Sequence, residues 1–256
     1  MPLHSPLTVL IAQDLRARWS GGILTWAWAL IQPAVQIALY GVVFGAIMVP
    51  RGTAFPSTGA YVVFLCSGVF CWLGFSESLA RGTTALVEGG SLIRGRGVTP
   101  ILLPLRAVGT AWLLAMIGFT GSLVIAPLAG VAPTWTWLLL PLPLIALILL
   151  AAGLALVLAP MAVLTRDTIQ LVHLVLPLGF WATPIVYEPS ILPAWAQAVQ
   201  AANPLAPAIS AIHDLLLRGS IPSLDQWILM TLWPFAALVI GLGLLRRLEG
   251  EVRDAL

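Results

Sequence analysis

Apolar residues along this chain fall into long runs that carry no charged side chain, and short polar segments separate the runs. A helix needs roughly 20 consecutive apolar residues to cross the hydrocarbon core of a bilayer. The longest charge-free stretch, residues 107–165, is divided by Pro127, Gly130 and Pro133 into two runs of that length. The pattern therefore predicts six membrane-spanning helices. They cover residues 23–49, 58–80, 107–126, 137–164, 168–187 and 226–245.

Residues 5–19 precede the first predicted span and show a different pattern. Leu7, Ile11 and Leu15 recur at helical spacing, while the polar side chains lie mostly on the opposite side. The segment is too short and too charged to span, so we expect an amphipathic helix that lies along the membrane surface. An ordinary juxtamembrane helix that only anchors the chain is the alternative.

The segment between the fifth and sixth spans, residues 188–224, contains an uncharged part from Pro189 to His213 that prolines and side-chain amides interrupt every few residues. Such a stretch cannot form one lipid-exposed helix, because each break frees backbone groups that need hydrogen-bond partners. We therefore expect a re-entrant or interfacial helical hairpin on the outer side of the membrane.

Composition excludes a water-soluble protein. Hydrophobic residues make up 60% of the chain and charged residues 9%, whereas soluble domains carry about 25% charged residues. The fold class we expect is an all-α integral membrane protein. The twelve basic residues are all arginines and are scattered along the chain, so the pattern does not indicate a surface for nucleic acid.

Arginine placement predicts the orientation, because cytoplasmic loops of membrane proteins carry an excess of positive side chains. With six spans and the N-terminus inside, only Arg51 and Arg218 fall on the outer side. The inner segments hold Arg16, Arg18, Arg81, Arg94, Arg96, Arg106, Arg166, Arg246, Arg247 and Arg253. We therefore predict that both termini are cytoplasmic.

No stretch of the sequence matches a catalytic or nucleotide-binding motif. A phosphate-binding loop of the GxxxxGK[ST] kind requires a lysine, and the chain has none. Cys66 and Cys71 lie in one apolar run, where we interpret them as packing residues. The sequence therefore predicts a protein that is not an enzyme and has no metal or cofactor of its own. Any nucleotide chemistry must reside on a partner.

The longest predicted inner loop, residues 81–106, contains a short helical stretch around Thr84–Ile93 that ends at Gly95 and Gly97. The charged side chains in and directly after this stretch are Glu88, Arg94 and Arg96. A short helix between two spans is suited to receive a push from a soluble motor domain. A plain basic loop that only obeys the charge rule for cytoplasmic segments is the alternative.

Four separated motifs resemble one known family. The loop 81–106, preceded by FSESLARG, is similar to the cytoplasmic coupling region of type-2 ABC exporter permeases that move O-antigen polysaccharides and teichoic acids. So are the opening segment with Asp14 and Arg16, and TRDTIQ at residues 165–170. The most specific motif is FWATPIVYEPSILP at residues 180–193, with Asn203, Pro204 and Arg218 after it. This chain departs from the family's pattern at Val98, Thr99, Pro100 and Thr183, and it has no lysines in the loop.

The resemblance implies a half-transporter of the bacterial inner membrane that forms a homodimer and binds two P-loop ATPase subunits. Those subunits would hold the ATP and Mg, and a lipid-linked glycan would pass between the protomers, among membrane lipids. The residues that would couple to the ATPase are Asp14, Arg16, Arg18, Glu88, Leu92, Ile93 and Arg94. Arg166 and Asp167 would form an acidic and basic pair at the inner turn between the fourth and fifth spans.

Aromatic residues are the candidates for the lining of a glycan channel, because sugars present apolar faces together with hydroxyl groups. On the first and fifth predicted spans these are Trp26, Trp28, Tyr40, Phe180, Trp181 and Tyr187. The tryptophans near span ends are expected in the interfacial belts of the membrane. They are Trp19, Trp135, Trp137, Trp195 and Trp227.

Two other classes of protein stay open. A channel or a proton-coupled secondary transporter requires ionisable residues at mid-membrane, and His173 comes nearest to that description. A membrane-embedded glycan or acyl transferase requires a cluster of carboxylates or histidines at one membrane face, and the sequence pattern does not converge on one.

Overall fold

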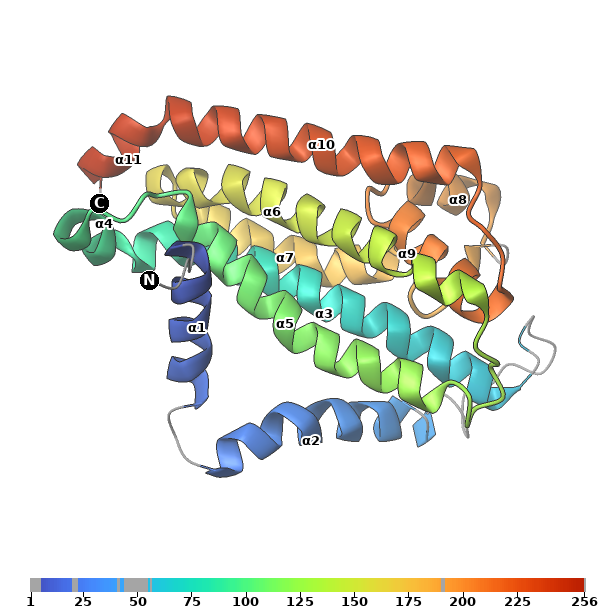
Figure 1. Cartoon of the computed structure of the whole chain (residues 1–256). Helices are drawn as coiled ribbons and strands as arrows, with labels where there is room; N and C mark the ends of the chain where they lie inside the picture. Colours follow the sequence, from blue (N-terminus) through green and yellow to red (C-terminus); the bar gives the residue numbers. More distant parts are fainter. Residues whose placement is uncertain are drawn as a thin grey trace.

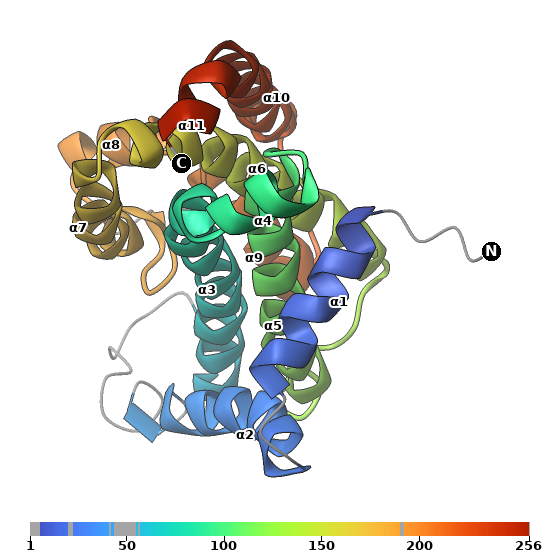
Figure 2. The same cartoon turned by 90° about the vertical axis from the view of Figure 1, so that its left-hand side faces the viewer.

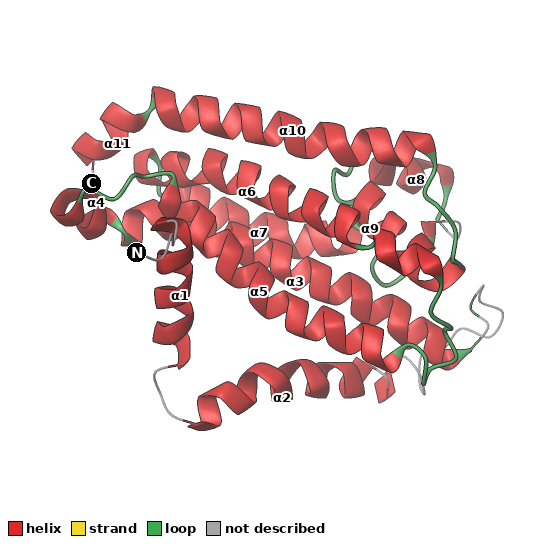
Figure 3. Ribbon diagram, in the orientation of Figure 1, coloured by secondary structure: helices red, strands yellow, loops and turns green. Residues whose placement is uncertain are grey.

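The computed structural model of the chain describes residues 6–19, 23–40, 42–43, 55, 57–189 and 192–255 (Figure 3). Within these residues the secondary structure is helical, which confirms the expected all-α class. The helices are α1 (Pro6–Trp19), α2 (Ile23–Tyr40), α3 (Thr58–Glu88), α4 (Gly90–Arg96), α5 (Leu102–Ile125), η2 (Trp135–Leu139), α6 (Pro141–Leu164), α7 (Asp167–Ala182), α8 (Ala194–Ala201), α9 (Ala206–His213), η4 (Asp214–Arg218), α10 (Leu224–Arg247) and α11 (Glu249–Ala255).

The long helices form a bundle around α3 (Figure 1). α3 packs against α5, α6 and α7, and α10 packs against the far side of α6. The side chains of α3 are buried along most of its length, and they include Phe70, Cys66 and Cys71. Both cysteines are free and buried, which confirms their interpretation as packing residues. Ser57 begins α3 as an N-cap, because its Oγ accepts a hydrogen bond of 3.1 Å from the Ala60 amide.

The first two helices lie outside this bundle (Figure 2). α1 runs across the direction of the long helices and contacts α5, where Ile11 sits over Gly109. That direction is the one a helix along a membrane surface requires. α2 packs against α5 and α3 on the side of the bundle away from α10.

The two ends of the bundle carry different elements (Figure 1). The start of α1, the short helix α4 and the last helix α11 lie at one end, which we call the α4 end. The short helices η2, α8 and α9 lie at the other end. Residues 81–106 and most of residues 188–224 thus lie at opposite ends of the bundle, and the side of the membrane on which each end lies stays a prediction.

Within the described residues, four helical stretches are long and apolar enough to cross a bilayer: α3, α5, α10, and η2 together with α6. They correspond to the second, third, sixth and fourth predicted spans. The first predicted span, residues 23–49, ends in residues that lie outside the described part of the chain. The fifth corresponds to α7, which has 16 residues. The chain is therefore membrane-embedded, and the count of six spans stays a prediction.

α7 ends earlier than the predicted boundary at residue 187. Thr183 is extended, with φ −104° and ψ 142°, directly before Pro184. A residue that precedes proline is pushed out of the helical region by the proline ring, so the helix stops at Ala182. The apolar residues that follow belong to the connection toward α8.

The predicted inner loop is more helical than its pattern indicates. The sequence pattern predicts a span that ends at residue 80, but α3 continues to Glu88. α4 then begins after Gly89 and ends at Gly97, which adopts a left-handed φ of 62°. α5 begins at Leu102, five residues before the predicted boundary, because Pro104 is tolerated in a first helical turn and Arg106 is part of the helix.

The segment 188–224 contains short helices, as the sequence predicts. α9 is buried by other parts of the chain from Ala206 to His213. Buried neighbours can satisfy the backbone groups that broken helices free, which is the condition for such a segment at membrane depth. The re-entrant position itself stays a prediction.

Candidate functional site

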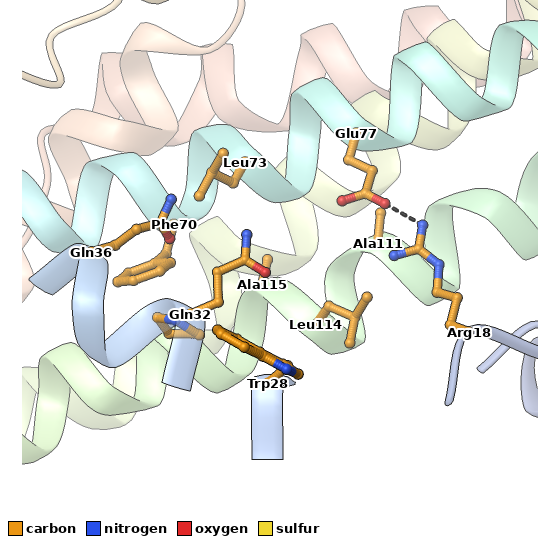
Figure 4. Close-up of a pocket in the computed structure, with 11 residues that line it drawn as sticks. Arg18, Trp28, Gln32, Gln36, Phe70, Leu73, Glu77, Ala111, Leu114 and Ala115 are labelled. Carbon is orange, nitrogen blue, oxygen red and sulfur yellow. Dashed lines mark hydrogen bonds and ion pairs between the residues drawn. The ribbon is translucent and has the colours of Figure 1, made fainter. Parts of the chain in front are cut away.

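Ion pairs fasten α1 to α3 near the α4 end. The Arg81 guanidinium donates two hydrogen bonds to the Asp14 carboxylate, at 3.0 and 2.8 Å. Arg18 pairs with Glu77 (Figure 4), and Arg81 Nη1 lies 4.0 Å from Glu77 Oε1. Four charges from two helices thus form one network.

The electrostatics of this network favour a charged Asp14. Its burial alone would raise the pKa of the carboxyl group. The hydrogen bonds and positive charge of Arg81 and the charge of Arg106 outweigh the burial, and the pKa is lowered from its ordinary value. The carboxylate therefore stays ionised and holds α1 against α3 at neutral pH.

Asp14→Asn is expected to lower the free energy of unfolding by about 2 kcal/mol, because Arg81 keeps its burial and loses a charged acceptor. A depressed folded-state pKa stabilises the protein above the ordinary carboxyl pKa of about 3.9, and that stabilisation is lost as the pH falls through the folded pKa. The gap in melting temperature between wild type and variant should therefore be constant at neutral pH and shrink only in acid. The control is Asp225→Asn, at an exposed carboxyl in the first turn of α10. Equal melting temperatures of wild type and Asp14→Asn at neutral pH would contradict this role.

The predicted coupling residues of α1 divide into two groups. Asp14 and Arg18 face the bundle in the ion-pair network, whereas Arg16 is exposed. The sequence indicates polar residues on one side of this helix, but it does not show that two of them bond to α3. Only Arg16 is thus positioned to meet a partner directly.

The coupling residues around α4 divide in the same way. Glu88 and Arg94 are exposed, whereas Ile93 is buried and Leu92 is half-buried. Ile93 belongs to a second hydrophobic core with Leu103 of α5. α4 is therefore anchored to the bundle by its apolar side and presents its charged side outward.

Arg166 and Asp167 are exposed at the turn between α6 and α7, at the α4 end of the bundle. Among the ion pairs of the described residues, none involves either side chain. Arg166 and Asp167 are thus adjacent in sequence but do not form an ion pair with each other. Both side chains are accessible to a partner protein.

Three of the aromatic channel candidates gather at the end of α7. The rings of Phe180 and Trp181 lie 5.4 Å apart, edge to face. The Tyr187 hydroxyl donates a hydrogen bond of 2.5 Å to the Trp181 carbonyl. Phe180 also packs edge to face against Trp72 of α3, at 5.7 Å. Sequence reasoning missed Trp72, because nothing in its own span marks it as a neighbour of α7.

The exposure of these aromatics differs. Trp181 and Trp28 are 64% and 59% exposed, whereas Phe180 is half-buried against Trp72. Exposed rings are available to a ligand or a second protomer, and buried rings contribute packing. The side chains of Trp26 and Tyr40 lie outside the described part of the chain.

The motif at residues 180–193 is bonded to the segment that follows it. The Asn203 side-chain amide donates hydrogen bonds to the Ala182 carbonyl at 3.0 Å and to Thr183 Oγ1 at 2.9 Å. Arg218 pairs with Glu188 and with Asp214. Residues that the sequence separates by 20 or more positions thus lock the end of α7 to α9 and η4.

A cavity of about 460 Å³ lies between α2, α3 and α5 (Figure 4). It is lined by Arg18, Trp28, Gln32, Pro33, Gln36, Phe70, Leu73, Glu77, Ala111, Leu114 and Ala115. Of these, the sequence indicates only Arg18 and Trp28 as candidate site residues. Two glutamines four residues apart in an otherwise apolar span are the signal that could have revealed it.

Two histidines bear on the alternative of proton transport. His173, the sequence candidate, is exposed on α7. His213 is buried, and its Nε2 lies 3.0 Å from the Phe64 carbonyl oxygen. A ring that packs against Phe64 in a tilted arrangement, with centroids 3.9 Å apart, is a packing residue with one hydrogen bond. Neither residue has the surroundings of a mid-membrane relay.

Comparison with known proteins covers nearly the whole chain. A family model described as ABC-2 type transporter matches residues 6–217. The chain is 23% identical over 255 residues to an O-antigen export system permease protein RfbA of Klebsiella pneumoniae, across 99% of this chain and 96% of that protein. The protein of that name from Myxococcus xanthus is 24% identical over 221 residues, across 86% of this chain and 83% of its own length.

Proposed function

Because this chain belongs to the ABC-2 type transporter family, we propose that it is the membrane subunit of an ATP-driven exporter of a lipid-linked polysaccharide. The observation that supports this most is the similarity, along nearly its whole length, to permeases named for O-antigen export. The chain itself is a transport permease rather than an enzyme. The substrate we propose is an O-antigen or a related capsule-like or teichoic-acid-like glycan.

We place the ATPase at the α4 end of the bundle. Glu88 and Arg94 are exposed there, together with Arg16 and the turn at Arg166 and Asp167. Ile93 anchors α4 to the core that also contains Leu86 of α3. A push on α4 would therefore move α3, because closely packed side chains transmit displacement rather than absorb it.

The transport complex that we propose has two copies of this chain and two copies of a separate P-loop subunit. ATP and Mg bind to the P-loop subunits, since a chain without lysine cannot form their phosphate loop. The glycan passes between the protomers along exposed aromatic side chains such as Trp181. The membrane is the bacterial inner membrane, and the α4 end with both termini faces the cytoplasm.

The test is reconstitution of the purified chain in lipid vesicles, with and without a P-loop ATPase subunit of an ABC exporter from the same organism. The chain alone should hydrolyse no ATP, and the assembled complex should hydrolyse ATP and export glycan. Glu88→Gln combined with Arg94→Gln should lower export and ATPase stimulation by about threefold to tenfold, because rim charges contribute a modest part of an interface. Gln13→Leu, at an exposed position of α1, is the control and should leave both unchanged.

Robust hydrolysis by the isolated chain would contradict the assignment of ATP chemistry to a partner. Normal assembly and normal export by the Glu88 and Arg94 double variant would show that α4 does not receive the motor.

A further inference from the structure

The cavity between α2, α3 and α5 joins an aromatic ring to several hydrogen-bonding groups (Figure 4). α2 contributes Trp28, Gln32 and Gln36, and all three side chains point toward α3 and α5 in the close-up. Glu77 of α3 and Arg18 of α1 close the cavity at its α4 end. Its walls between these groups are apolar side chains and alanines.

The two glutamines are the unusual feature of this cavity. They lie one helical turn apart, so both amides occupy the same face of α2. Within the described part of the chain, no hydrogen bond joins either amide to another residue. Gln32 is exposed and Gln36 is half-buried, so both amides are accessible to a ligand. Hydroxyl groups both donate and accept hydrogen bonds, so they match the donors and the acceptor of each amide.

Trp28 supplies a flat apolar surface beside these amides. Its side chain is 59% exposed, so the ring does not serve mainly to pack α2 against the bundle. An indole ring combines an apolar face with an N–H donor. A sugar ring has the complementary form, an apolar C–H face with hydroxyl groups around its edge.

The charges around the cavity favour a neutral sugar over a phosphate as its ligand. Arg18 is paired with Glu77, and the neighbouring Arg81 is paired with Asp14. No uncompensated positive charge therefore faces the cavity from these residues, so an anion gains little there. The Glu77 carboxylate retains lone pairs that can accept hydrogen bonds from hydroxyl groups.

The cavity is long enough for a short saccharide. Phe70 and Glu77 line its two ends and are seven residues apart on α3, which is roughly 10 Å along a helix. We propose that the cavity binds neutral sugar units, with a ring face on Trp28 and hydroxyl groups bonded to Gln32, Gln36 and Glu77. The site rests on the proposed function, because these units would belong to the exported glycan.

The test measures equilibrium binding to the full chain in nanodiscs of phosphatidylethanolamine and phosphatidylglycerol. The probes are the glycan released by mild acid from the surface polysaccharide of the producing strain, and dodecyl phosphate as a lipid phosphate without sugar. Gln32→Leu combined with Gln36→Leu should weaken glycan binding by about tenfold, the upper range for a net hydrogen bond. Trp28→Ala should weaken it similarly, and Trp28→Phe should retain most of it.

Matched controls use the same changes at exposed positions outside the cavity, Gln13→Leu and Trp135→Ala, and both should bind like wild type. The melting temperature of each variant is measured in parallel, and the glutamine variant decides the result if Trp28→Ala does not fold. Wild-type affinity in a folded glutamine double variant would overturn the proposal. Displacement of the glycan by dodecyl phosphate would also overturn it, since the cavity would then be a site for lipid phosphate.

Failure of this inference is distinguishable from failure of the proposed function. If the assembled wild-type complex exports glycan and the glutamine double variant binds and exports normally, only the cavity proposal is wrong. If the wild-type complex exports nothing while the isolated chain binds glycan through these residues, the export function is wrong and the sugar site stands.

Discussion

Gly153→Leu is expected to separate α10 from α6 and to leave little folded protein. A β-carbon built on Gly153 would lie 2.5 Å from the Ala237 carbonyl carbon and 2.6 Å from the Leu238 nitrogen. These are backbone atoms, which cannot rotate away as a flexible side chain can. Helices in membranes associate through such close contacts of small residues. The loss in folding free energy should exceed about 4 kcal/mol, the range of severe core substitutions.

The measurement is the melting temperature and yield of the detergent-solubilised chain. Gly243→Leu is the matched control, because Gly243 lies on α10 with no atom within 4 Å of a built β-carbon. It should fold like wild type. If Gly153→Leu also folds like wild type, the close approach of α6 and α10 described above is wrong.

Trp181→Ala is expected to reduce export of long glycan by about thirtyfold while the protein stays folded, if Trp181 lines the conduit of the proposed exporter. Loss of a tryptophan that anchors a ligand typically costs about 2 kcal/mol or more. The side chain is 64% exposed, so its removal should change the folding free energy by less than about 0.5 kcal/mol. Export by the assembled complex is measured beside its melting temperature.

Phe180→Ala, at the residue before Trp181, is expected to behave differently. Its ring packs on Trp72, so the substitution should lower the melting temperature, and export should fall only in proportion to the folded protein present. A Trp181→Ala variant that behaves in this second way would assign Trp181 to packing. Normal export by a folded Trp181→Ala variant would remove it from the conduit.

The residues of α4 show which features of the site can be predicted from the sequence. The family resemblance groups Leu92, Ile93 and Arg94 as coupling residues, and the three are consecutive in the sequence. The structure buries Ile93 and exposes Arg94. Adjacent residues of a helix project about 100° apart, so neighbours in sequence need not share a role. Which of them faces the bundle depends on where Leu103 and Leu245 pack.

Helix boundaries show a similar limit. Charge-free runs locate spans because a bilayer excludes charge, but helices continue past the hydrocarbon core wherever their backbone allows. α3 extends to Glu88 for that reason. α7 instead stops at Ala182, before Pro184, although apolar residues continue. Pro184 is therefore the feature of the sequence that predicts the end of α7 at Ala182.

The sequence by itself determined that this chain is an all-helical membrane protein, and its motifs indicated the family. Both follow from local properties, since the bilayer selects apolar runs and a motif is read residue by residue. Only the tertiary structure decided which side chains meet. Arg18 and Glu77 are 59 residues apart, and Asp14 and Arg81 are 67 apart. No local pattern encodes such pairs, because they depend on how α1 and α2 pack against a bundle that other segments form. The cavity beside α2 arises from that packing alone.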